Sequence, residues 1–417
     1  MKIIKRDVYL NKIINSENNG MIKVITGIRR CGKSFLLDPL FKNYLLDKGI
    51  NEEHIIKLDL DERKNKKYLD PDVLDNYIRE KIVDDKMYYV LLDEVQKVSD
   101  FESVLNGFLH INNLDVYVTG SNSKFLSSDI ISEFRGRGDE IKVYPLSFKE
   151  FVDAYDGNKY DAWNEYIVYG GMPNILTKKN DEQKSKYLKD LFNNTYINDI
   201  IERYDIGRSD VLDSTIDILS SSVGSLSNPL NIANTFKSKG MGNVSRNTIE
   251  QYINYLIDAF MINKVGRYDI KGKKYISSPC KYYFTDIGLR NARLNFRQIE
   301  QNHLMENIIY NELVMRGYNV DVGVIEQYGK DKDKTVRRQY EIDFVCNLGS
   351  KRYYIQSALN IDDEDKKIQE IRPFTCIDDF FKKIIIVKDD TLPYYNENGI
   401  LIIGIKDFLL DNNSLEI

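Results

Sequence analysis

The octapeptide GIRRCGKS at residues 27–34 restricts the possible folds of this chain more than any other segment. It matches the pattern G-x-x-x-x-G-K-[ST], it follows an apolar run that starts at Ile22, and helical apolar spacing begins directly after it. The pattern is informative between a strand and a helix, which is the context found here. In that context backbone amides surround phosphate oxygens, and the start of the helix adds partial positive charge. We therefore expect the phosphates of a nucleotide to be bound by Gly27, Arg29, Arg30, Cys31, Gly32, Lys33 and Ser34.

Two side chains of this loop have specific expected roles. Lys33 is expected to reach the β and γ phosphates, and the Ser34 hydroxyl is expected to hold Mg²⁺. A second segment supports this interpretation, because the apolar run from Tyr88 ends in two carboxylates. Asp93 is expected to bind Mg²⁺ directly or through water, and Glu94 is expected to act as general base on the attacking water. The alternative is an acidic strand end that only faces solvent.

Further candidates lie after the next apolar run. Ser121 or Asn122 could sense the γ phosphate and align the attacking water, although a simple turn at a strand end would have the same sequence. The segment RGRG then offers Arg135 and Arg137. Either arginine could act as a finger across the interface of a homo-oligomer and stabilise charge on the transferred phosphoryl group. A solvated loop is an equally good interpretation of this segment.

The first third of the chain predicts an α/β fold with a parallel sheet. Fully apolar strands separated by helices are typical of a parallel sheet that is covered on both faces. The strands expected here begin at Ile22, Ile55, Tyr88, Asp115 and Glu140. Beyond them, helical patterns are expected at 148–155, 162–169 and about 183–203.

Composition places the chain among ordinary soluble proteins. Hydrophobic residues make up 42% and charged residues 29%, so neither wholesale disorder nor a membrane-embedded class fits. The sequence has no run of eighteen apolar residues and no signal-peptide core at its start, so we expect a cytoplasmic protein. Its few cysteines and histidines are widely separated, which argues against a disulfide framework and a zinc finger. A net charge of −5 excludes a uniformly basic nucleic-acid coat, but not one basic face.

Six segments together resemble one known family. They are GIRRCGKS, YYVLLDEVQ, VTGSNS, the RGRG turn, VYPLSFKEF and YGGMP. This combination is similar to the AAA-type ATPases of archaea and bacteria that carry a C-terminal domain of unknown function, nuclease-like and of the DUF4143 type. The similarity extends over the whole chain. The resemblance implies an AAA-like P-loop NTPase fold with ATP as the nucleotide and Mg²⁺ as the metal, and it implies no substrate.

Residues 209–295 have the order helix, helix, helix, strand, strand, which is typical of a winged helix. The third helix is expected to begin after the N-cap Ser245. Residues 237–282 hold nine basic and three acidic side chains, an excess that a DNA-facing surface needs. In duplex DNA the third helix would enter the major groove and a lysine-bearing wing would contact phosphates. A module that docks on protein, or a lid, is the alternative. The candidate DNA contacts are Arg246, Asn247, Gln251, Lys271, Lys273 and Lys274.

Residues 296–417 resemble a restriction-endonuclease core whose active-site pattern is broken. Glu306, Glu341 and Asp343 stand at carboxylate positions. In the pattern D-x(n)-[DE]-x-K, two carboxylates hold Mg²⁺ and a lysine assists the attacking water. Here Gln356 and Ala358 stand at the second carboxylate and at the lysine. An amide lowers the charge that holds a hard cation, and alanine relays no proton, so we expect a degenerate domain used for packing or recognition.

These parts predict four domains and one function. An AAA-like ATPase domain is expected at 1–175, a helical lid or linker at 176–208, a winged helix at 209–295 and a nuclease-like α/β domain at 296–417. We expect a Mg²⁺-dependent ATPase that couples its nucleotide state to the binding of duplex DNA and does not bind membranes. Two alternatives stay open: an ATP-dependent nuclease, and a nucleotide-loaded scaffold whose winged helix binds protein.

Overall fold

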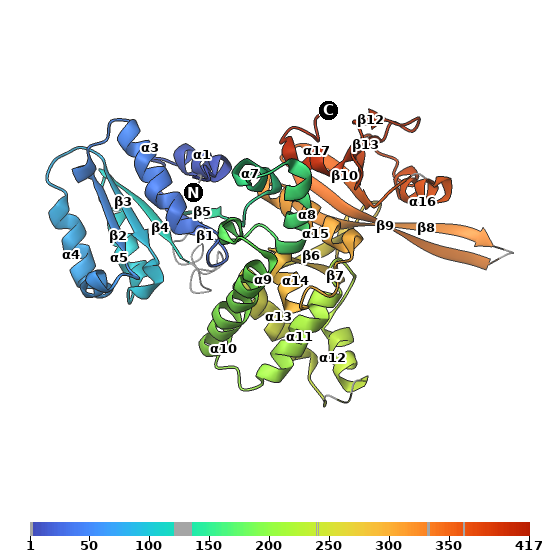
Figure 1. Ribbon diagram of the computed structural model, residues 1–417, viewed down its shortest axis with the longest axis horizontal. Coiled ribbons are helices and arrows are strands. Elements are labelled where there is room, and N and C mark those ends of the chain that lie inside the picture. The colour runs from blue at the N-terminus through green and yellow to red at the C-terminus, as the bar shows by residue number, and fades with distance from the viewer. Residues whose placement is uncertain (1–2, 121–135, 239, 241, 332–333, 362) are drawn as a thin grey trace. The chain divides into compact units, whose positions relative to one another are not determined.

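A computed structural model describes residues 3–120, 136–238, 240, 242–331, 334–361 and 363–417 (Figure 1). The chain divides into two compact units. Unit 1 holds residues 1–145 together with Asp258–Phe260, and unit 2 holds Leu146–Ile257 together with Met261–Ile417. In the described ranges, no helix combines the length and the hydropathy that a bilayer crossing requires.

Unit 1 is built on a five-stranded sheet in the order β2-β3-β4-β1-β5. All neighbouring strands are parallel, which confirms the prediction from the apolar runs. Every residue of β1 and β3 is buried, which explains why these strands lack polar alternation. Because β4 lies between β1 and β3, the strand before the octapeptide does not pair with the strand that ends at Asp93. The strands are β1 (Ile22–Thr26), β2 (Ile55–Asp59), β3 (Tyr88–Asp93), β4 (Leu114–Thr119) and β5 (Gly138–Lys142).

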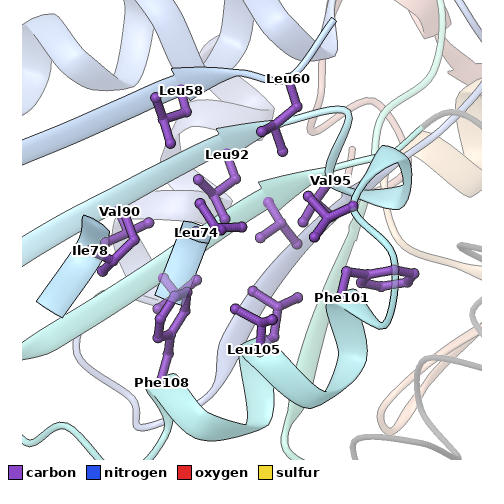
Figure 2. Close-up of a cluster of buried hydrophobic side chains, with 14 of the residues drawn as sticks. Leu58, Leu60, Leu74, Ile78, Val90, Leu92, Val95, Phe101, Leu105 and Phe108 are labelled. Carbon is purple, nitrogen blue, oxygen red and sulfur yellow. The ribbon is translucent and has the colours of Figure 1, made fainter. Parts of the chain in front are cut away.

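Helical segments contribute to the cores on both faces of this sheet. On one face, Leu74 of α4 and Phe108 of α5 share a buried cluster with Val90 of β3 (Figure 2). Alternate strand residues point to opposite sides of a sheet, so Tyr117 of β4 faces the other side. There its ring lies 4.5 Å from the ring of Phe41. The α-helices are α1 (Asp7–Asn15), α2 (Lys33–Phe35), α3 (Lys42–Asp47), α4 (Pro71–Lys81) and α5 (Phe101–Phe108). A π-helical segment covers Leu36–Phe41, and 3₁₀ turns cover Glu52–His54, Arg63–Leu69 and Val95–Lys97.

Unit 2 is built on an eight-stranded mixed sheet in the order β12-β13-β11-β10-β9-β8-β6-β7. The two strands expected in the winged helix, β6 and β7, form an antiparallel hairpin, and β6 pairs in parallel with β8. One continuous sheet therefore joins the strands of the third and fourth expected domains. The strands are β6 (Ile262–Asp269), β7 (Lys274–Phe284), β8 (Asn319–Asp331), β9 (Lys334–Leu348), β10 (Lys351–Ala358), β11 (Lys382–Val387), β12 (Tyr394–Tyr395) and β13 (Leu401–Gly404).

The strand β8 was absent from the sequence prediction. It pairs with β9 in a long antiparallel hairpin, and its alternation of Val320, Val322 and Val324 is the strand signal that the prediction missed. The prediction of one long helix over 183–203 is close to the structure. There, α9 (Asp181–Asp190), a π-helical segment (Leu191–Ile197) and α10 (Asn198–Tyr204) follow one another without a break.

Residues 209–284 have the predicted order of three helices and two strands, and the assignment of this region to the winged-helix type stays a prediction. The hydroxyl of Ser245 accepts the backbone N–H of Thr248 at 3.0 Å, which confirms the expected N-cap. The remaining helices of unit 2 are α7 (Phe148–Ala154), α8 (Lys159–Tyr169), α11 (Ser209–Ser221), α12 (Pro229–Ser238), α13 (Arg246–Asp258), α14 (Ile287–Arg293), α15 (Gln301–Met315), α16 (Glu364–Thr375) and α17 (Ile405–Leu410), with a 3₁₀ turn at Pro173–Thr177.

Candidate nucleotide site

The octapeptide forms a tight loop at the carboxyl end of β1. Gly27 and Gly32 have φ angles of 137° and 103°, a region that other residues rarely adopt. A β-carbon on Gly27 would lie 2.1 Å from the carbonyl oxygen of Val143, so a side chain has no room there. Arg30 also has positive φ, at 62°. The loop conformation therefore depends on glycine at both ends of the G-x-x-x-x-G spacing.

The ammonium of Lys33 points back into this loop. Its Nζ donates to the carbonyl oxygens of Gly27 at 2.9 Å and Ile28 at 3.1 Å, and the residue is buried. These carbonyls stand in for an anion, since Nζ needs acceptors when it is removed from water. A bound phosphate would offer charged acceptors in their place, which is the exchange that the sequence motif predicts.

The carboxylate of Asp93 meets two hydroxyls at the same edge of the sheet. The hydroxyl of Thr119, the last residue of β4, donates to Asp93 Oδ1. The Ser34 hydroxyl also hydrogen-bonds this carboxylate. Burial raises the pKa of Asp93, while the bonds from Thr119 and Ser34 oppose that shift. The structure thus brings together the two residues that the sequence assigns to Mg²⁺. Hydroxyl and carboxylate oxygens are ligands that suit this hard cation.

Thr119 is a site residue that the sequence prediction did not assign. Its Oγ1 also accepts the backbone N–H of Glu94 at 3.0 Å, so one hydroxyl connects both carboxylate-bearing residues. Glu94 has a φ of 57° and accepts a hydrogen bond from the Gln96 side chain through Oε2. The available signal for Thr119 was its position as the last residue of an apolar strand. Its significance depends on β4 lying beside β3, which the sequence does not show.

Asp59 is a second site residue that the prediction missed. It ends β2 and stands opposite Asp93 in the parallel register of the two strands. Its negative charge, with that of Glu94, contributes to the raised pKa of Asp93. Both charges act on the Asp93 carboxylate, but among the described residues no three acidic, histidine or cysteine side chains are grouped closely enough to hold a metal ion by themselves.

The other catalytic candidates of unit 1 fall into two groups, namely residues outside the described ranges and Arg137. Ser121, Asn122 and Arg135 lie in 121–135, outside the described residues. Arg137 is exposed, and its carbonyl oxygen accepts the N–H of Ile22 at 3.0 Å. That contact places Arg137 at the amino ends of β1 and β5, roughly 16 Å along the strand direction from the loop. Arg137 therefore does not serve the phosphate loop of its own chain in this structure.

The predicted DNA contacts of unit 2 are exposed. Arg246, Asn247 and Gln251 lie on the outer side of α13, and Lys271, Lys273 and Lys274 lie in and beside the turn between β6 and β7. The count of basic residues in this region needs a correction, because two of them face inward. Arg267 and Lys281 are buried, so they add no charge to the surface.

Lys281 lies among the carboxylates of the expected nuclease-like core. Its Nζ is 2.8 Å from Glu306, 2.8 Å from Glu341 and 3.5 Å from Asp343. The three carboxylates hold the pKa of Lys281 above its usual value despite its burial. The nuclease pattern requires a lysine at position 358, where this sequence has alanine. The structure supplies the cation from β7, a strand assigned to a different domain.

Two family models match this chain. A model described as an AAA domain matches residues 19–152, and a model described as a domain of unknown function, DUF8612, matches residues 160–300. These matches support the AAA resemblance of the first part. They support neither the DUF4143 type nor a nuclease-like identity for the later parts.

Relatives cover nearly the whole length of the chain. An uncharacterised protein of Haemophilus influenzae is 33% identical over 418 residues, which span 98% of this chain and 99% of that protein. An uncharacterised protein of Methanocaldococcus jannaschii is 27% identical over 392 residues, which span 89% and 81%. Among solved structures, the Aeropyrum pernix ORC1 protein in complex with DNA aligns with 70% of this chain and 93% of its own, at 10% identity and a TM-score of 0.28. That score is too low for the likeness to support an argument.

Proposed function

The chain belongs to one family with the Haemophilus influenzae protein, and from the match of residues 19–152 to an AAA domain we propose that it binds ATP with Mg²⁺, hydrolyses the nucleotide and couples its nucleotide state to duplex DNA. One observation supports the ATPase most directly. Ser34, Asp93 and Thr119 form a hydrogen-bonded set beside a phosphate loop whose lysine is already turned inward.

In this proposal each residue of the phosphate loop and of the adjoining strand ends has one task. Lys33 exchanges the Gly27 and Ile28 carbonyls for phosphate oxygens. Ser34 and Asp93 hold Mg²⁺, which neutralises phosphate charge when bound. Glu94, fixed at its backbone by Thr119, orients the attacking water and accepts its proton. We assign Arg137, exposed at the opposite edge, to the nucleotide of a neighbouring copy.

The DNA half of the proposal is supported by the exposed side chains of α13 and the β6–β7 turn. Asn247 and Gln251 carry amides that can pair with the edge of adenine, and Arg246 can donate to guanine. Lysines at 271, 273 and 274 extend into solvent, where they can neutralise phosphates. Glu250 lies 3.8 Å from Arg246 and opposes a phosphate at that position.

The experiment that tests this function is ATP turnover by the full chain, with and without duplex DNA. The parent is expected to hydrolyse ATP faster with DNA, and Lys33→Ala is expected to lose nucleotide binding. Glu94→Gln is expected to bind ATP while its turnover falls by about 100-fold or more, because general-base catalysis is lost. Equal turnover by the parent and Lys33→Ala would refute the ATPase. Turnover that ignores DNA, together with protein binding that is insensitive to salt, would favour the scaffold.

We propose that the last part of the chain does not cleave nucleic acid. The observation behind this is the ammonium of Lys281, which forms ion pairs with the Glu306, Glu341 and Asp343 carboxylates and so competes with a metal for these oxygens. Nicking of duplex DNA in Mg²⁺ or Mn²⁺ that disappears in Asp343→Asn would establish the nuclease alternative instead.

A further inference from the structure

The segment that leaves unit 1 for unit 2 has a structure that the proposed function does not explain. We call Val143–Pro145 the exit segment. It follows β5 and ends the first stretch of unit 1, and Leu146 begins unit 2. It lies in the motif VYPLSF, and the glycines of the motif YGGMP lie further along unit 2.

The exit segment packs directly on the phosphate loop. The missing side chain of Gly27 is what allows the Val143 carbonyl to approach, since a β-carbon would lie 2.1 Å from its oxygen. The thiol of Cys31 reaches the same oxygen at 3.5 Å. Close-packed groups cannot shift independently, so a displacement of either end of the loop also displaces Val143.

Arg6 joins the loop to the exit segment with two hydrogen bonds. Its Nη1 donates to the Cys31 carbonyl at 3.0 Å, and its Nη2 donates to the Tyr144 carbonyl at 2.6 Å. The side chain is buried, and its guanidinium lies 4.6 Å from the ring centre of Tyr9. The Tyr9 hydroxyl in turn accepts the N–H of Tyr144 at 3.2 Å. A planar fork can hold two carbonyls at fixed positions, whereas the single nitrogen of a lysine cannot match both.

The first residue beyond the exit segment is anchored inside unit 2. The N–H of Leu146 donates to the Gly171 carbonyl at 2.7 Å, and the Tyr166 hydroxyl donates to the Leu146 carbonyl at 2.9 Å. Gly171 then donates its N–H to Asp286 Oδ2 at 2.7 Å. Chain connectivity and these bonds form one path from the loop to Asp286.

We propose that Arg6 is a positioning residue that couples the phosphate loop to the exit segment. Through this coupling, nucleotide binding changes the dynamics of the chain around Leu146. The inference rests on the proposed binding of ATP. Lys33 must leave the Gly27 and Ile28 carbonyls to reach phosphate, and Gly27 is the residue in contact with Val143. Arg6 keeps the other end of the loop attached to Tyr144, so the exit segment responds to the change instead of separating from the loop.

The test is amide hydrogen exchange of the full chain, with and without ATP and Mg²⁺, alongside calorimetric titration of ATP. In the parent, ATP is expected to slow exchange in the loop and, by about fivefold or more, in segment 146–171. Arg6→Lys is expected to bind ATP within about threefold of the parent, to keep protection of the loop and to lose protection of 146–171. Lys5→Ala, an exposed change on the same segment, is the matched control and is expected to behave like the parent.

The outcomes separate the two proposals. Full ATP-dependent protection of 146–171 in Arg6→Lys would overturn the role of Arg6 while leaving ATP binding intact. A parent that releases no heat with ATP would overturn the proposed function itself. If Arg6→Lys does not fold, Tyr9→Phe tests the same link, because it removes the hydroxyl that accepts the Tyr144 N–H. A partial loss of protection in 146–171 is expected for Tyr9→Phe, and unchanged protection would contradict the inference.

Discussion

Nζ of Lys281 lies 2.8 Å from Oε1 of Glu306, so a buried cation on β7 forms an ion pair with a carboxylate on α15. Glu341 and Asp343 on β9 share the same ammonium, and the Tyr283 hydroxyl donates to Glu306 at 2.6 Å. A buried lysine with several carboxylate partners is costly to disturb, because each remaining charge would lack compensation. This cluster therefore ties the β6–β7 hairpin to the last part of the chain.

Replacing Lys281 by methionine tests this tie. We expect Lys281→Met to lower the unfolding free energy of unit 2 by about 3–5 kcal/mol, since three carboxylates would keep no cation. Trp163 of α8, the only tryptophan, lies in unit 2, so its fluorescence during urea denaturation reports on this unit. Lys274→Met, an exposed change on the same strand, should alter stability by no more than about 0.5 kcal/mol. Similar midpoints for both variants would contradict the prediction.

The stability of unit 2 should depend on pH through Glu306. Burial raises the pKa of Glu306 to about 7, with Asp343 adding to the shift and Lys281 opposing it. The folded state then holds a proton that the unfolded state has released above its ordinary pKa, so stability falls as pH rises from about 4.5 to 7. Relative to Glu306→Gln, the parent should lose about 2 kcal/mol between pH 5 and 8. Parallel pH profiles from urea denaturation would show that Glu306 does not titrate as described.

Thr119 offers a test of the nucleotide site that leaves the phosphate loop untouched. Thr119→Val keeps the shape of the side chain but removes the donor to Asp93 and the acceptor of the Glu94 N–H. Groups that orient a metal ligand typically contribute 10- to 100-fold to activity, so we expect ATP turnover to fall by about that factor. Thr235→Val, a change at a half-buried position in unit 2, is the control. Turnover equal to the parent's would show that Thr119 does not contribute to the site.

The DNA proposal predicts a salt-dependent affinity that the β6–β7 turn controls. Changing Lys271, Lys273 and Lys274 together to glutamate should weaken duplex binding and reduce the slope of log affinity against log salt by about 3. Fluorescence anisotropy of a labelled duplex over a salt series measures both quantities. A slope that stays the same would place the phosphate contacts elsewhere on the protein.

Local chemistry makes part of this protein predictable from short stretches of its sequence. The loop at 27–34, the strand that ends at Asp93 and the cap at Ser245 each depend on a few consecutive residues, whose backbone geometry and hydrogen bonds follow from residue type and spacing. The alternation of apolar strands and helices likewise predicted the parallel sheet of unit 1. The continuous sheet of unit 2 was not predictable in this way. Its strands β6 and β8 pair across 50 or more residues of sequence, and the sequence of neither strand determines their register.

The sequence alone therefore determined that a phosphate loop would precede a helix and that carboxylates would end a neighbouring part of the sheet. Only the tertiary structure decided that β4 separates β1 from β3, which places the Thr119 hydroxyl against the Asp93 carboxylate and the Glu94 N–H. It also decided that Arg6 meets Tyr144 and that Lys281 meets Asp343. Such pairs lie far apart along the chain, and they are selected by the packing of whole elements, which no local pattern of residues encodes.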